Sequence, residues 1–142
     1  MSLLNAIDIN ATGMKAQRQR VEVSTSNLAN ARTTRTVEGG PYRRQDVVFR
    51  AKSFAGTLAA ERGGWAPRGV EVVAVVDDPT PFFESYEPGH PDADGEGYVS
   101  YPNVNVMKEM ANLANASRSY QANLSAMSVI KTMIQRTLDI AR

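Results

Sequence analysis

The chain has 142 residues, a formal net charge of +1, one histidine and no cysteine. The lack of cysteine excludes disulfides and thiolate metal sites, and one imidazole excludes any site that needs two. The net charge favours neither nucleic acid nor a membrane as a partner. Asp8 interrupts the first apolar run, so we expect no cleaved signal peptide. The longest apolar run, Val72 to Val76, is far below the roughly 20 residues that membrane insertion needs.

The first segment, residues 1–31, predicts one helix from residue 3 to about residue 30. Its apolar residues recur at alternating steps of three and four, as in a heptad seam. Gly13 costs about 1 kcal/mol relative to alanine inside a helix, so this helix is not strong by itself. The seam runs through Leu4, Ile7, Ala11, Met14, Arg18, Val21, Thr25 and Leu28.

The middle segment, residues 32–101, carries β and turn signals. Two runs rich in β-branched residues predict strands at 47–49 and 69–76, and shorter strands are expected at 82–86 and 97–101. Residues from about 51 to 68 are rich in alanine, glycine and arginine and predict a mobile loop.

The last segment, residues 102–142, predicts the longest helix. Asn103 or Asn105 can cap it after Pro102, and no proline or glycine interrupts the chain from Val106 to Ala141. A pair of the two helices would leave the longer one overhanging by about 15 Å. The default interpretation of each stripe is an internal helix-pair core, but the overhang favours other subunits as partners. The seam is Val106, Met110, Leu113, Ser117, Tyr120, Leu124, Met127, Lys131, Ile134, Leu138 and Ala141.

Charge in the middle segment is segregated. Residues 32–68 hold eight basic and three acidic side chains, whereas residues 69–101 hold eight acidic and no basic ones. The two segments could pair within one hairpin. Alternatively, the acidic face of one subunit meets the basic face of its neighbour, which would direct assembly more than it adds affinity.

Three local patterns could indicate a metal, catalytic or nucleic-acid site. The acidic turn from Asp92 to Gly97 resembles the start of a calcium loop, but Asn103 stands where the bidentate glutamate belongs, so an acidic turn is favoured. His90 has no nucleophile pattern to serve. Tyr42-Arg43-Arg44 places an aromatic beside two cations, which a strand with a charged solvent face explains more simply than nucleic-acid binding. We therefore expect no enzyme activity, cofactor or metal.

Three further motifs carry a family resemblance. The stretch from Ser24 to Ala31 (Ser-Thr-Ser-Asn-Leu-Ala-Asn-Ala) resembles the Ser-x-Asn-Leu-Ala-Asn signature of the axial proteins of the bacterial flagellum. The turn from Tyr86 to Asp94 and the helical stretch Ala116 to Asn123 resemble the proximal rod members of that family in particular. Residues 50–68 match nothing in it.

The resemblance implies a mainly α fold with a small β region, in which the long N- and C-terminal helices pack as an antiparallel coiled coil and the β-rich middle lies outside. It implies a structural subunit of the basal-body rod, which assembles helically into the drive shaft that crosses the periplasm and transmits motor torque. The alternative is another axial component, either a different rod subunit or a hook subunit. A hypothesis from a different class of function is a metal-dependent or hydrolytic enzyme that uses the acidic turn.

The resemblance also implies partners. These are copies of the chain itself, other rod subunits, and the export apparatus and chaperones during type III secretion, which needs no cleaved signal. The side chains expected to pack between subunits are Leu4, Ile7, Met14, Val21, Asn27, Leu28, Asn30, Met110, Leu113, Ser117, Arg118, Tyr120, Gln121, Asn123, Leu124, Met127, Ile134 and Leu138.

Overall fold

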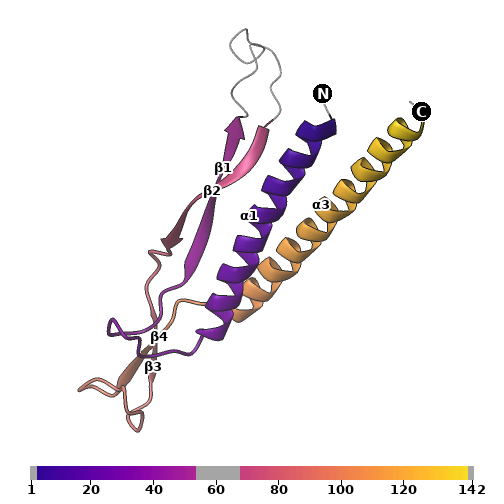
Figure 1. Cartoon of the computed structure of the whole chain (residues 1–142). Helices are drawn as coiled ribbons and strands as arrows, with labels where there is room; N and C mark the ends of the chain where they lie inside the picture. The colour runs from indigo at the N-terminus through magenta and orange to yellow at the C-terminus, as the bar shows by residue number, and fades with distance from the viewer. Residues whose placement is uncertain (1–2, 54–67, 141–142) are drawn as a thin grey trace.

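Two long terminal helices dominate the computed structural model, which describes residues 3–53 and 68–140. Helix α1 spans Leu3–Ala29 and helix α3 spans Val106–Ile140, so both predicted helices are present with bounds close to those expected. The helices lie side by side, and the two ends of the chain are found at the same end of the molecule (Figure 1). At 35 against 27 residues, α3 is longer by about 12 Å.

Three contacts show how the helices face each other. The Asn27 side chain reaches Glu109, and Arg20 reaches Asn112, so residue numbers fall along α1 as they rise along α3. Further along, a Cβ added at Gly13 would lie 3.0 Å from the side-chain nitrogen of Asn123. Gly13 weakens α1 by propensity, but its missing side chain allows α3 to approach closely at this point.

The first β-ribbon joins strand β1, Gln45–Ser53, to strand β2, Arg68–Asp77, in antiparallel register with a bulge between Val48 and Phe49. A two-stranded ribbon is marginally stable alone in water. Here it lies along α1 (Figure 1), and the Val70 N–H donates a 3.1 Å hydrogen bond to the Thr12 hydroxyl. The strands predicted at 47–49 and 69–76 are confirmed. The ends of the predicted mobile loop, residues 51–53 and 68, belong to these strands instead, because β1 and β2 stay paired as far as Ser53 and Arg68. Residues 54–67 of that loop lie outside the described residues.

The second β-ribbon joins β3, Phe83–Tyr86, to β4, Tyr98–Tyr101, and lies beyond the helices at the end opposite the termini (Figure 1). Val99 is fully buried within it. Gly97 has a φ of +86°, and a Cβ there would lie 2.9 Å from the Tyr86 ring, so only glycine fits this turn.

The apolar core is small for a chain of this length. Among the described residues, the buried apolar side chains are only Ala16, Val99 and Ala116. In the part of the chain that the structure describes, no helix is long and apolar enough to span a membrane.

Candidate assembly interface

A cluster of buried and half-buried polar side chains joins the ends of the two helices to both ribbons. We call it the polar junction, and it consists of Asn27, Arg44, Asp78, Asn103 and Glu109. Asn27 comes from the last turns of α1 and Glu109 from the first turn of α3. Arg44 precedes β1, Asp78 follows β2, and Asn103 follows β4. Both helices and the strands β1, β2 and β4 therefore reach or border on this point.

An ion pair forms the centre of the polar junction. The Arg44 Nε donates a 2.9 Å hydrogen bond to Glu109 Oε1, and the Arg44 Nη1 donates one of 3.0 Å to Asp78. The side chains of Arg44 and Glu109 are 8% and 1% exposed. Burial disfavours the charged form of Arg44, but the hydrogen bond and charge of Glu109 outweigh it, and the pKa of Arg44 lies above its ordinary value. The expected solvent-facing strand at residues 42–44 is wrong, because β1 begins only at Gln45 and Arg44 is buried.

Asn27 uses both ends of its amide, and it is 0% exposed. Its Nδ2 donates to the Gln45 carbonyl at 2.8 Å and to Glu109 Oε2 at 3.3 Å. Its Oδ1 accepts from the Gln45 N–H at 2.9 Å and from the Tyr42 hydroxyl at 3.0 Å. A side chain that must both donate and accept in a closed space specifies asparagine at this position.

Asn103 ties the second ribbon to the first. Its Oδ1 accepts a 2.8 Å hydrogen bond from the Arg44 N–H, and its Nδ2 donates to the carbonyls of Asp78 and Thr80. Hydrogen bonds from the Thr80 backbone and hydroxyl, together with Arg44, hold the pKa of Asp78 below its ordinary value. The capping role expected of Asn103 or Asn105 falls to Asn105, whose Oδ1 accepts from the Lys108 N–H.

The polar junction fixes which face of α3 meets α1. Because Glu109 must point at Arg44 and Asn27, the face turned to α1 follows a line displaced by one residue from much of the heptad seam. That line passes through Ala116 and Asn123 rather than Ser117 and Leu124. The apolar face of α3 is broader than one seam, so the sequence pattern alone does not set the rotation of the helix.

The expected packing residues therefore fall into two groups. Asn27 is buried, and half-buried side chains are found at Ile7, Met14, Val21, Leu28, Asn30, Leu113, Tyr120, Asn123, Met127 and Ile134. Exposed side chains are found at Met110, Ser117, Arg118, Gln121, Leu124 and Leu138. The side chain of Leu4 lies outside the described residues.

Large apolar side chains on α3 face away from α1. Met110 and Leu124 are 49% and 50% exposed, and Val129 and Met133 are 60% and 51% exposed on another side of the helix. Near the C-terminal end, Leu138 and Ile140 are also exposed. Exposed apolar surface of this extent is typical of surfaces that bind another protein.

Part of the segregated charge is paired within the chain. Arg50 on β1 forms an ion pair with Glu71 on β2, and Arg35 reaches Asp92 at 3.7 Å. In the acidic turn, Asp94 Oδ1 accepts from the Glu96 and Tyr98 N–H groups. These carboxylates already serve protein donors, and the described residues contain no group of three or more metal-binding side chains.

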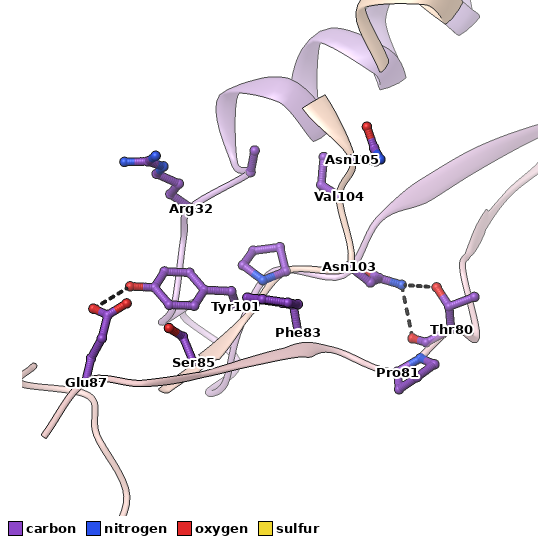
Figure 2. A pocket seen from close by; sticks show the side chains of 12 residues that line it. Arg32, Thr80, Pro81, Phe83, Ser85, Glu87, Tyr101, Asn103, Val104 and Asn105 are labelled. Atoms are coloured by element: carbon purple, nitrogen blue, oxygen red, sulfur yellow. Dashed lines mark hydrogen bonds between the residues drawn. The ribbon is translucent and has the colours of Figure 1, made fainter. Parts of the chain in front are cut away.

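A groove of about 670 Å³ lies at the end of the molecule away from the termini. We call it the end groove. Figure 2 shows Phe83, Pro81 and Tyr101 along it, with Arg32 at its rim and Glu87 hydrogen-bonded to the Tyr101 hydroxyl at 3.1 Å. Its full lining is Ala31, Arg32, Thr80, Pro81, Phe83, Ser85, Glu87, Tyr101, Pro102, Asn103, Val104 and Asn105.

Most of the polar junction was not recognisable from the sequence. Asn27 was selected through the family signature, whereas Arg44, Asp78, Asn103 and Glu109 were not selected as site residues. One feature of the sequence points to the polar junction. Glu109 is a carboxylate in the first turn of the predicted helix, next to apolar positions. Its partner Arg44 is 65 residues away, and only the fold brings the two together.

Comparison with known proteins agrees with these features. The family described as "Flagella basal body rod protein" matches residues 7–35, and "Flagellar basal body rod FlgEFG protein C-terminal" matches residues 96–140. The chain is 42% identical to the flagellar basal-body rod protein FlgC of Yersinia enterocolitica and to that of Salmonella typhimurium. It is 39% identical to the FlgC of Bacillus subtilis, and in all three cases the whole of both chains is covered.

Proposed function

The chain belongs to the FlgC family of flagellar basal-body rod proteins, and on this premise we propose that it is a structural subunit of the rod. The relatives that it matches over their full length carry that function in their names. This role requires no chemical reaction, and the side chains of the polar junction are engaged in structural contacts with one another.

The exposed surface of the single chain is the observation that best supports an assembling subunit. On α3, Met110 and Leu124 are 49% and 50% exposed, and Leu138 and Ile140 near its end are 64% and 87% exposed. Apolar side chains of this kind gain stability when another protein covers them. An assembled rod would supply neighbouring subunits on the faces of α3 that α1 leaves uncovered.

In the assembled rod, α1 and α3 form an antiparallel coiled coil in the axial core, with residues 1–31 and 102–142 contributing that core. Residues 32–101 form the outer region. The exposed packing residues of α3, such as Met110 and Leu124, meet helices of neighbouring copies or of other rod subunits. Many interlocked contacts of this kind would carry torque through the periplasmic drive shaft.

Delivery to that place requires export. Membership of the rod family supports passage through the flagellar export apparatus, with chaperones acting on the unfolded chain. A helix pair held by few buried apolar side chains suits a subunit that crosses unfolded and gains its stability on assembly.

The test is deletion of the chain in its source bacterium, followed by complementation and counting of hooks and filaments by electron microscopy. Loss of all hooks, restored by complementation, is the expected result. Normal flagella after deletion, in a genome without a second copy, would exclude the rod function.

A further inference from the structure

The C-terminal end of α3 and the β3–β4 ribbon lie at opposite ends of the molecule (Figure 1), and residues of that ribbon line the end groove. Resting on the proposed rod function, we propose that the end groove receives the C-terminal end of the terminal helix of the next rod subunit along the axis. The ligand is defined by its chemistry as an apolar helix end with basic flanks, as in residues 129–140 of this chain.

The apolar parts of the two surfaces match. Phe83 on the wall of the end groove is 67% exposed, and Leu138 and Ile140 on the tip of α3 are 64% and 87% exposed. No described part of the chain covers them. Burial of such side chains favours association by about 25 cal/mol for each Å² removed from water.

The charges match as well. Among the residues that line the end groove, Glu87 is acidic and could face a basic side chain of the incoming helix. The α3 tip carries Lys131 and Arg136 against one carboxylate, Asp139. Arg32 at the groove rim would in turn face the negative end of the helix dipole. Complementary charge of this kind fixes the orientation of the partner.

A contact between the end groove of one subunit and the α3 tip of the next can be repeated along a filament. A contact between two different surfaces at opposite ends of a subunit is heterologous, so it repeats without closing and gives an open filament. The polar junction lies next to the end groove, because Asn103 belongs to both. A force on the helix tip would then pass into both helices of the receiving subunit.

The experiment places the photo-crosslinking residue p-benzoylphenylalanine at Phe83 in the full chain, in cells that assemble rods, and identifies the linked peptides by mass spectrometry. The matched control carries it at Glu84, the next residue of β3, which is exposed on the opposite face of the ribbon. The expected product links position 83 to the C-terminal helix of a rod subunit, at least tenfold more often than position 84.

A link from position 83 to a β-region, to a protein that is not a rod subunit, or to nothing in assembled rods would overturn the inference. Motility of the same strain reports separately on the rod function. A motile strain without the expected link rejects the groove contact and leaves the rod function standing, whereas normal flagella after deletion of the chain reject the rod function itself.

Discussion

Single residues show how a buried charge specifies this structure. Arg44 and Glu109 are removed from water, and their mutual contact is tolerable only because Asn27, Asp78 and the nearby backbone satisfy their remaining hydrogen-bonding groups. An apolar cluster of the same volume would provide stability without directionality. The polar junction instead permits one rotation of α3 and one position of each ribbon.

Removal of the Glu109 carboxylate should therefore be costly. We expect Glu109→Ala to reduce the free energy of unfolding by about 3–5 kcal/mol, because Arg44 is left as a buried charge without its main partner. Glu22→Ala is the control, since it breaks the exposed pair with Arg18 and should cost less than about 1 kcal/mol. Urea denaturation of the purified chain measures both, and equal effects would contradict the role of the polar junction.

Asp78 makes the polar junction sensitive to acid. Its folded-state pKa lies below the ordinary value, so the unfolded chain binds the proton more tightly than the folded chain does. The contribution of Asp78 is complete above an unfolded pKa of about 3.9 and is lost as the pH falls through the folded value.

The expected outcome is a difference in unfolding free energy between the natural chain and Asp78→Asn that is constant near neutral pH and shrinks below about pH 4. Denaturation series at several pH values measure it. Glu84→Gln, at an exposed site, is the control and should show no such trend. A difference that does not change with pH would show that Asp78 is not held in its charged form.

Among the elements, α3 has two roles that its sequence pattern does not separate. One face packs on α1 along a line through Glu109, Ala116 and Asn123, and the other faces expose methionine, leucine and valine. The heptad seam runs between these faces. Its residues therefore include both half-buried and exposed side chains. Substitutions of the half-buried ones should lower the stability of the free chain, whereas substitutions of the exposed ones should affect assembly alone.

Leu124 and Met127 provide the comparison. Leu124 is half exposed, so Leu124→Asp should leave the stability of the free chain nearly unchanged but block assembly, with export intact. Met127 is partly covered, so Met127→Asp should lower stability as well. Ser125→Asp, at an exposed polar position, is the control. Hook counts, secreted amounts and urea denaturation give the three readouts, and motile cells with Leu124→Asp would contradict helix packing between subunits.

The whole molecule is elongated (Figure 1), and both helices and both ribbons meet at the polar junction. Few apolar side chains are buried, and α3 is longer than the helix that supports it. Helices in proteins gain most of their stability from packing against other elements. Order in the free chain should therefore decline from the polar junction toward the termini.

Hydrogen exchange of the purified chain tests this gradient. Amides of α3 near Glu109 and Ala116 should be protected, whereas those beyond about residue 130 should exchange fast and become protected only in assembled rods. Circular dichroism should show less helix than the 27 and 35 residues of α1 and α3. Full helix content in the free chain would contradict the expectation that assembly completes the fold.

The sequence by itself determined the two helices, the four strands and the family. Helix and strand formation depend on residues close together in the chain, and their periodicities are visible along it. The Gly97 turn and the Asn27 signature are equally local in sequence, although the reasons for both lie in packing.

Only the tertiary structure decided how those elements contact one another. It brought Arg44 to Glu109, gave Asn27 its four hydrogen bonds and set the rotation of α3 one residue away from the heptad seam. These outcomes depend on pairs of residues far apart in the chain. The physical reason is that a buried charge must be matched in three dimensions, and a one-dimensional pattern contains no information on which distant partner will meet it.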